Sequence, residues 1–266
     1  VKTTAKKDIR ALSKDQLREF FVSQNEKAFR GNQVYEWLWN KACYDFEDMT
    51  NLSKETRAML EANFVINNIK VDTQQRSKDG TIKNAVKLHD GFVVESVMIP
   101  TDNRTTACVS SQVGCSLDCK FCATAKLKRL RNLNPDEIYD QVVAIDKQSR
   151  YYNNRPLSNI VYMGMGEPLM NYKNVLASVE KITSEEGLNM SPKRITVSTS
   201  GVPKMIKKLA DDQVKFNFAV SLHSARDEVR TQIMPFNAKF SLEALRESLE
   251  YWYAKTQKRV TYEYIV

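Results

Sequence analysis

The chain has 266 residues, of which 42% are hydrophobic and 27% are charged, enough for one large domain or for a large and a small one. It has no apolar run of about 18 residues, and its first residues lack the apolar stretch of a signal peptide, so we expect neither a membrane span nor export. The net charge of +8 favours a polyanionic partner such as RNA, although an ordinary basic protein explains it equally well.

The five cysteines are distributed unevenly, with four of them between Cys108 and Cys122. A secreted disulfide framework spreads its cysteines along the chain, whereas a tight cluster indicates metal binding or redox chemistry in a reducing compartment. We therefore expect a cytoplasmic protein. The isolated Cys43 is interpreted as a structural core residue.

The first seventy residues predict a small domain of short helices. Ser13 has the chemistry of a helix N-cap, and Ser53 repeats that signature further along the chain. Between them, Gly31 and Asn32 are expected to interrupt the helical pattern before a helix over residues 33–41. The aromatic side chains of this region are interpreted as core.

Residues 71–103 change to β-rich composition. Two runs, over residues 83–88 and 92–99, flank Asp90-Gly91, which is a hairpin signal. Glu95 lies inside the second run, and an isolated carboxylate on a strand is most simply a solvated one. This segment predicts a β-hairpin extension.

From residue 104 onwards, strands and helices alternate. Repeated βα units imply an α/β fold with a parallel sheet, either open or rolled into a barrel. The expected strands cover residues 105–110, 159–163, 194–198, 215–222 and 259–266, and the expected helices cover residues 135–147, 175–182, 203–210 and 242–253. Asn134, followed by proline, is the expected N-cap of the first of these helices.

The cysteine-rich loop follows the first of these strands. Cys115, Cys119 and Cys122 are spaced C-x3-C-x2-C, and three thiolates can ligate three irons of a [4Fe–4S] cluster. A closed zinc site usually needs four protein ligands, and the two histidines, His89 and His223, are distant in sequence. The spacing favours an iron–sulfur cluster whose fourth iron is open to a substrate or cofactor, with zinc as the alternative.

Several motifs together give this chain a family resemblance. The cysteine spacing, with an aromatic residue before the last cysteine, resembles the radical S-adenosylmethionine (SAM) enzymes. More closely, the chain resembles the RlmN/Cfr family of RNA adenine methyltransferases. The motifs are Cys-Val-Ser-Ser-Gln-Val-Gly-Cys at 108–115, Met-Gly-Met-Gly-Glu-Pro at 163–168, Ser-Thr-Ser-Gly at 198–201, Ser-Leu-His at 221–223, and the RlmN-like segment at 29–38.

The resemblance implies an architecture and two cofactors. Residues 104–266 would form a radical SAM core, a partial (βα)6-type barrel whose C-terminal part is missing after about the fifth strand. Residues 71–103 would be its β-hairpin extension, and residues 1–70 an RNA-binding accessory domain. The implied cofactors are a [4Fe–4S] cluster and SAM.

The resemblance also implies roles for individual residues. Glu95 matches a proton-accepting carboxylate, and Cys108 matches a cysteine that resolves a covalent intermediate. The implied cluster ligands are Cys115, Cys119 and Cys122, and the implied SAM-binding residues are Gly166, Glu167, Ser198, Ser221, Leu222 and His223.

The implied activity is methylation of adenine C2 in 23S rRNA, and in tRNA as well, through a methyl-cysteine intermediate and a 5′-deoxyadenosyl radical. A reductant such as flavodoxin would supply the electron, and the protein is expected to be a monomer. The methyl-carrying cysteine of the family is expected beyond Val266. The basic segment 126–131, together with Lys204, Lys207 and Lys208, is a candidate RNA contact. A C8-methylating, Cfr-like enzyme and a non-enzymatic zinc- or RNA-binding module remain as alternatives.

Overall fold

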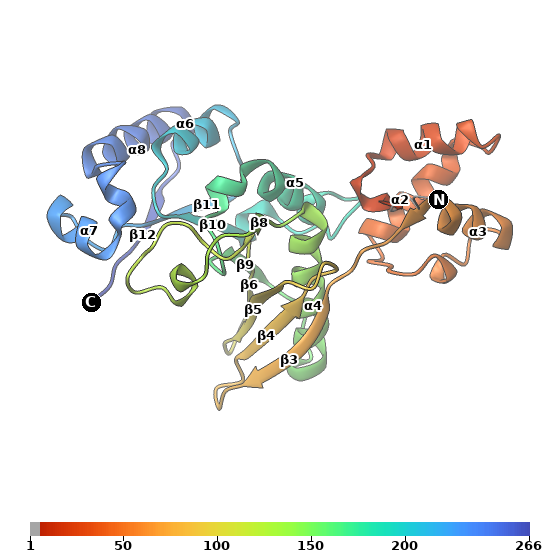
Figure 1. Cartoon of the computed structure of the whole chain (residues 1–266), viewed down its shortest axis with the longest axis horizontal. Helices are drawn as coiled ribbons and strands as arrows, with labels where there is room; N and C mark the ends of the chain where they lie inside the picture. Colours follow the sequence, from red (N-terminus) through yellow and green to blue (C-terminus); the bar gives the residue numbers. More distant parts are fainter. Residues whose placement is uncertain (1–5) are drawn as a thin grey trace. The chain divides into compact units, whose positions relative to one another are not determined.

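The computed structural model describes residues 6–266, which form two compact units (Figure 1). One unit holds the chain up to Ile69 together with Glu180–Met190, and the other holds Lys70–Val179 and Ser191–Val266. No helix among residues 6–266 has the length and apolarity needed to cross a bilayer.

The first unit consists of short helices. Its helices are α1 (Lys14–Ser23), α2 (Phe29–Trp39) and α3 (Lys54–Asn63), and a small parallel pair joins β1 (Lys7–Asp8) to β2 (Phe64–Val65). Both predicted N-caps are confirmed, since Ser13 accepts from the Gln16 amide and Ser53 accepts from the Thr56 amide. The core of the unit includes Ile9, Leu17, Phe21, Val34, Leu38, Trp39 and Leu60.

The expected interruption at Gly31 and Asn32 is wrong, because α2 runs through both residues. Gly31 is buried against α1, and a Cβ atom there would lie 2.6 Å from the Arg18 backbone nitrogen. The glycine therefore allows two helices to pack closely, and this packing compensates for its poor helix propensity.

Residues Glu180–Met190 belong to the first unit although they lie between the two stretches of the second unit in sequence. Helix α5 (Tyr172–Thr183) ends in this segment. The Lys181 ammonium donates to the Tyr35 hydroxyl and lies 4.9 Å from the centre of the Trp39 ring. The Asn40 side chain donates to the Gly187 carbonyl over 3.1 Å. These contacts fix the segment to α2.

The second unit is built on a mixed eight-stranded sheet, which confirms the predicted α/β class. All five strands predicted from the βα pattern are present and run parallel: β6 (Thr105–Cys108), β9 (Asn159–Tyr162), β10 (Ile195–Thr199), β11 (Asn217–Ser221) and β12 (Val260–Glu263). The sheet order is β12-β11-β10-β9-β6-β5-β4-β3, so these strands follow one another in space as in sequence.

Three antiparallel strands extend the sheet beyond β6. These are β3 (Lys70–Arg76), β4 (Ile82–Lys87) and β5 (Val93–Pro100). The predicted hairpin is confirmed, with Gly91 at a φ of +88° in the turn between β4 and β5. Strand β3 was not predicted, because its side chains are almost all polar and exposed. Such a strand suits a sheet edge, where charged residues discourage unwanted pairing.

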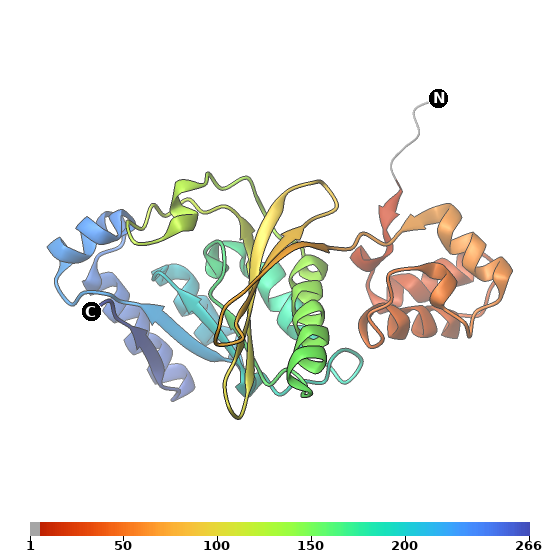
Figure 2. The same ribbon diagram turned by 90° about the horizontal axis from the view of Figure 1, so that it is seen from below.

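Helices cover one face of this sheet. They are α4 (Pro135–Asn153), α5, α6 (Pro203–Asp211) and α8 (Leu242–Thr256), whereas the short α7 (Asp227–Ile233) lies at the cysteine-rich loop. Helix α4 packs against β5 and β6, as Figure 2 shows, and α6 packs against α8. Helix α4 begins at the predicted Asn134 cap but continues to Asn153, and the short α7 was not predicted.

The two faces of the sheet differ in chemistry because side chains alternate along each strand. Ile160, Val197 and Phe218 are buried on the helix-covered face. The opposite face carries Cys108, Glu95, Thr196, Ser198, Ser221 and Glu263, which strand register places on one side. The sheet therefore presents a polar surface at the carboxyl ends of its parallel strands, where ligands of α/β proteins bind.

Candidate functional site

The cysteine-rich loop follows β6 and is closed at its base by two short strands, β7 (Gln112–Val113) and β8 (Arg131–Asn132). Just inside this closure, the Cys115 amide donates to the Leu127 carbonyl over 3.2 Å. Gly114 has a φ of +74°, and a Cβ atom there would lie 2.2 Å from the Lys128 carbonyl oxygen. Glycine is therefore required where the two sides of the loop meet.

Cys115, Cys119 and Cys122 line one cavity, and all three are free thiols. A turn brings the last two together, since the Cys122 amide donates to the Cys119 carbonyl over 3.1 Å. Buried Leu117 and Met234 form the apolar floor beneath the cysteines. The loop thus directs three soft sulfur ligands at a common, partly enclosed space.

The surroundings of the cysteines disfavour a thiolate that has no positive charge beside it. Burial raises the pKa of Cys115, and burial together with the other two cysteines raises the pKa of Cys119 to about 11. Iron ions supply the missing positive charge and favour the deprotonated ligand. The donor set therefore fits an iron–sulfur cluster.

The three sulfurs do not converge on a single point. Within residues 6–266, no group of three or more His, Cys, Asp or Glu side chains has the arrangement that one metal ion needs. A tetrahedral zinc ion requires all of its ligands at about 2.0–2.3 Å. Cluster thiolates are more widely spaced, because each binds a different iron.

The loop at 163–168 follows β9 and packs against the chain that leads into the cysteine loop. The Met165 amide donates to the Ser110 hydroxyl over 2.8 Å. Gly166 has a φ of +97°, and a Cβ atom there would lie 2.5 Å from Gln112 Cβ. The glycines thus allow close approach of two protein segments, and Gly166 also lines the cavity.

Glu167 lies at the wall of the same cavity and is 2% exposed. Its Oε1 accepts from the Leu169 amide over 3.0 Å and from the Thr199 hydroxyl over 2.7 Å. Its Oε2 accepts from the Ser200 amide over 2.8 Å. Burial raises the pKa of Glu167, and these donors oppose the rise. The carboxylate is held rigidly and keeps lone pairs for a cationic ligand such as an ammonium group.

Ser198 and Ser221 end neighbouring strands and share one acceptor, the carboxylate of Glu263. The Ser221 hydroxyl donates to Glu263 Oε2 over 2.7 Å, and the Ser198 hydroxyl donates to Oε1 over 3.2 Å. All three residues line the cavity. Sequence reasoning missed Glu263, although alternation along the last strand could have placed it on the same face.

His223 lies in the cavity at a φ of +56°, an uncommon conformation for a residue other than glycine. Its ring is 4.6 Å from the Phe121 ring, in an edge-on arrangement. Both ring nitrogens are buried, and neither has a hydrogen-bond partner among the described residues. Burial lowers the pKa of His223, so the neutral ring is favoured. Because buried polar atoms normally have partners, a ligand in this cavity fits the site.

Leu222, between these two cavity residues, faces elsewhere. It lines a larger groove of about 610 Å³ with α8 and β12, whose other members include Leu245, Leu249 and Tyr262. That groove is mainly apolar and includes none of the cysteines. At the cavity edge, Leu222 contributes its backbone, and its amide donates to the Glu263 carbonyl over 3.1 Å.

Cys108 and Glu95 lie on the polar face of the sheet but are not among the residues that line the cavity. Cys108 is next to it, since its sulfur is hydrogen-bonded to the Met163 backbone, and burial raises its pKa to about 11. Glu95 is half-exposed and forms an ion pair of 2.5 Å with Lys83 on the neighbouring strand. Its carboxylate is therefore available to a ligand that approaches the open face.

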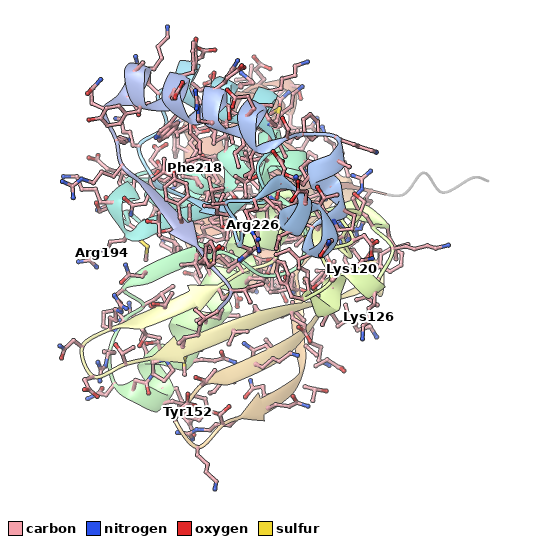
Figure 3. The ribbon with its side chains drawn as sticks, turned by 90° about the vertical axis from the view of Figure 1, so that its left-hand side faces the viewer. Lys120, Lys126, Tyr152, Arg194, Phe218 and Arg226 are labelled. Carbon is pink, nitrogen blue, oxygen red and sulfur yellow. The ribbon has the colours of Figure 1, made fainter. Side chains whose placement is uncertain are left out.

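The basic segment 126–131 contains two kinds of cation. Lys126, Lys128 and Arg129 are exposed, and Figure 3 shows Lys126 at the surface. Arg131 instead donates both of its terminal nitrogens to Glu137 over 2.7 Å each, and its Nε to Asp90 over 2.6 Å. Arg131 therefore ties α4 to the β4–β5 turn and is not free for a polyanion.

Two sequence models match this chain. One, described as the ribosomal RNA large subunit methyltransferase N-terminal domain, matches residues 7–66. The other, described as the radical SAM superfamily, matches residues 109–266. The first match falls on the helical unit and the second on the parallel strands and the cysteine loop.

Relatives that the whole chain resembles carry a consistent description. The chain is 77% identical to a probable dual-specificity RNA methyltransferase RlmN of Christiangramia forsetii, covering 98% of this chain and 74% of that protein. It is 74% identical to the protein of the same description from Flavobacterium johnsoniae, covering 98% and 75%. A crystal structure of a radical SAM methyltransferase from Sphaerobacter thermophilus matches with a TM-score of 0.90 and 35% identity, covering 98% of this chain and 76% of that one.

Proposed function

The chain belongs to the RlmN family of radical SAM RNA methyltransferases, and we propose on this basis that it methylates carbon 2 of adenine in RNA. The proposed substrates are 23S rRNA and tRNA, in keeping with the dual specificity named for its relatives. The observation that carries the proposal is the cavity in which three cysteines face Glu167 and the Ser198–Ser221–Glu263 network.

Cys115, Cys119 and Cys122 would hold the [4Fe–4S] cluster. Glu167 would accept the ammonium group of SAM, and Gly166, Ser198, Ser221, Leu222 and His223 would complete the SAM site. The support for these roles is the shared cavity, the rigid carboxylate of Glu167 and the unpaired nitrogens of His223. For Leu222, only the backbone is in position to contribute.

The reaction needs more than an ordinary base and nucleophile. Carbon 2 of adenine lies between two ring nitrogens, so it is electron-poor and carries no acidic proton. When bound, the cluster and SAM supply a 5′-deoxyadenosyl radical, which avoids both difficulties. Two of the protein's own residues would take part in the later steps. Glu95 would accept a proton at its carboxylate, and Cys108 would resolve a covalent intermediate through its sulfur.

The remaining parts of the chain receive roles from the same proposal. The helical region up to residue 70 would be an RNA-binding accessory domain, residues 71–103 an extension, and residues 104–266 the radical SAM core. Exposed Lys126, Lys128 and Arg129 would contact phosphates. A flavodoxin-like reductant, a monomeric state and a cytoplasmic location complete the proposal, and five free cysteines suit a reducing compartment.

Anaerobic turnover tests the proposal. The full-length protein, reconstituted with iron and sulfide, is incubated with SAM, a reductant and unmodified 23S rRNA or tRNA, and the RNA is digested for nucleoside mass spectrometry. We expect 2-methyladenosine. Methylation at C8 would instead identify a Cfr-like enzyme, and a colourless protein with stoichiometric zinc and no methylated product would refute the proposal.

A further inference from the structure

The cysteine loop is supported from beneath by a segment that the sequence patterns did not reveal. Helix α7 and the following turn, residues 227–238, pack against it. The Lys120 amide donates to the Ile233 carbonyl over 2.8 Å, and fully buried Met234 contacts Leu117 and Cys119. The position of Cys119 therefore depends on how this segment is anchored.

Arg230 is the anchor of α7, and it is 0% exposed. Its Nε donates to the Leu222 carbonyl over 3.0 Å, and its Nη1 donates to Asn237 Oδ1 over 2.5 Å. Its Nη2 donates to the Ser200 carbonyl over 2.6 Å and to the Ser221 carbonyl over 3.2 Å. The guanidinium thus joins α7 to the ends of β10 and β11, which carry the cavity residues.

No carboxylate is bonded to Arg230 within residues 6–266, although the Asp227 carboxylate acts on its charge from a greater distance. All four of its hydrogen bonds end on uncharged oxygens, and it takes part in no ion pair within residues 6–266. The nearby Asp227 carboxylate is engaged by the Asn237 side chain and the Leu242 amide. Burying a lone cation costs several kcal/mol, so a fully buried guanidinium is normally paired.

The thiolates of the cysteine loop would supply a negative charge close to the Arg230 guanidinium. A Cβ atom on Gly201 would be 3.5 Å from Arg230 Nη2, which places the guanidinium directly under the chain that lines the cavity. Ser200 connects Arg230 to Cys119, because its carbonyl accepts from Arg230 while its side chain hydrogen-bonds Cys119. The charge of Arg230 interacts with Cys119 and also with Asp227.

We propose that Arg230 is a positioning residue whose fixed positive charge balances the thiolate-ligated cluster and favours its reduced state. The inference rests on the proposed function, because it assumes that Cys115, Cys119 and Cys122 hold the cluster. One electron enters the cluster from the reductant, and Arg230 keeps its charge throughout. A fixed cation stabilises the more negative, reduced form, and net charge and hydrogen bonds are known determinants of cluster potentials.

The test is an electrochemical titration of the full-length protein after anaerobic reconstitution, followed by electron paramagnetic resonance, without RNA. In Arg230→Gln, we expect the ratio of reduced to oxidised cluster at a fixed potential to fall at least tenfold, which for one electron is about 59 mV. Arg230→Lys keeps the charge and should retain most of the wild-type ratio.

A second pair of variants leaves Arg230 in place. Asn237→Asp puts a carboxylate against the guanidinium and should also lower the ratio, whereas Asn237→Ala loosens the same segment without adding charge and should not. If Arg230→Gln does not fold, the Asn237 pair decides alone. Equal potentials in Asn237→Asp and Asn237→Ala would overturn the proposal, as would an unchanged potential in a folded Arg230→Gln protein.

The result is separable from the proposed function. A cluster that forms and shifts as expected, in a protein that methylates no RNA, supports the role of Arg230 and refutes the activity. RNA methylation together with an unchanged cluster potential in the variants supports the activity and refutes the role of Arg230. A wild-type protein that assembles no cluster contradicts both.

Discussion

The Ser221 hydroxyl donates a 2.7 Å hydrogen bond to the carboxylate of Glu263, which joins the ends of β11 and β12 at the cavity. The two residues are also aligned partners in the strand register. Because Ser198 donates to the same carboxylate from β10, two hydroxyls share one acceptor and three strand ends are joined. Glu263 therefore sets the orientation of two hydroxyls that the proposed function assigns to SAM binding.

Replacing Glu263 tests this arrangement. Glu263→Ala leaves both hydroxyls without their acceptor, and hydrogen bonds to charged groups contribute about 1.5–3 kcal/mol, so affinity for SAM should fall about tenfold to a hundredfold. Glu263→Gln keeps an accepting oxygen and should lose less. Equilibrium binding of SAM to the reconstituted protein measures the effect. Glu250→Ala, an exposed change on α8, is the control, and equal affinities in the two alanine variants would contradict the prediction.

Alanine substitutions should divide the cysteines into two groups. Loss of Cys115, Cys119 or Cys122 should remove most of the bound iron and the brown colour, because the cluster would keep only two thiolates. Cys43→Ala should retain both, since Cys43 lies in the helical unit and donates to the Asp45 carbonyl over 2.9 Å. Cys108→Ala should also retain the cluster but should lose RNA methylation. Iron content and visible absorption are the measurements.

The reactivity of Cys108 should depend steeply on pH. Burial raises its pKa to about 11, so the thiolate is a minor species at neutral pH and grows as the pH rises towards that value. Alkylation of Cys108 by iodoacetamide should therefore increase about tenfold per pH unit from about 7.5 to 9.5, whereas a free thiol, with a pKa of about 8.5, levels off. Peptide mass spectrometry reports the rate, and a plateau near that of a free thiol would count against the prediction.

Charge reversal should locate the RNA contact. Lys128→Glu combined with Arg129→Glu should weaken RNA binding at least tenfold at low salt and reduce the salt slope by about two. The matched control, Lys78→Glu with Lys255→Glu, also changes the net charge from +8 to +4 and should retain the affinity. Arg131 is unsuitable for this test because it holds Glu137 and Asp90. Filter binding over a range of salt concentrations measures both quantities.

Alanine substitutions at two glycines distinguish the cost of backbone strain from the cost of steric crowding. Gly91→Ala meets nothing within 4 Å and carries only the cost of its φ of +88°, about 1–2 kcal/mol. Gly166→Ala has a similar φ of +97° but places Cβ 2.5 Å from Gln112 Cβ, which adds about 1–3 kcal/mol. Chemical denaturation should rank the two, and Gly166→Ala alone should weaken SAM binding. Equal stability losses would show that the loop at 163–168 relaxes freely.

Features set by neighbouring residues were predictable from the sequence. The N-caps at Ser13, Ser53 and Asn134 depend on side chains within one turn of the backbone they satisfy. The five parallel strands followed from alternating strand and helix patterns, and the cysteine spacing alone indicated a cluster rather than a closed zinc site. Each of these signals is local, so it can be read along the chain.

The tertiary structure decided which distant groups meet. Gly31 stays helical because α1 packs on it, and Arg131 is drawn from the basic segment by Glu137 and Asp90. Glu263 joins Ser198 across 65 residues, and Arg230 reaches Ser200 across 30. Sheet register and burial determine these pairs, because a buried polar group must find a partner among whatever the fold brings near, and no local pattern records that choice.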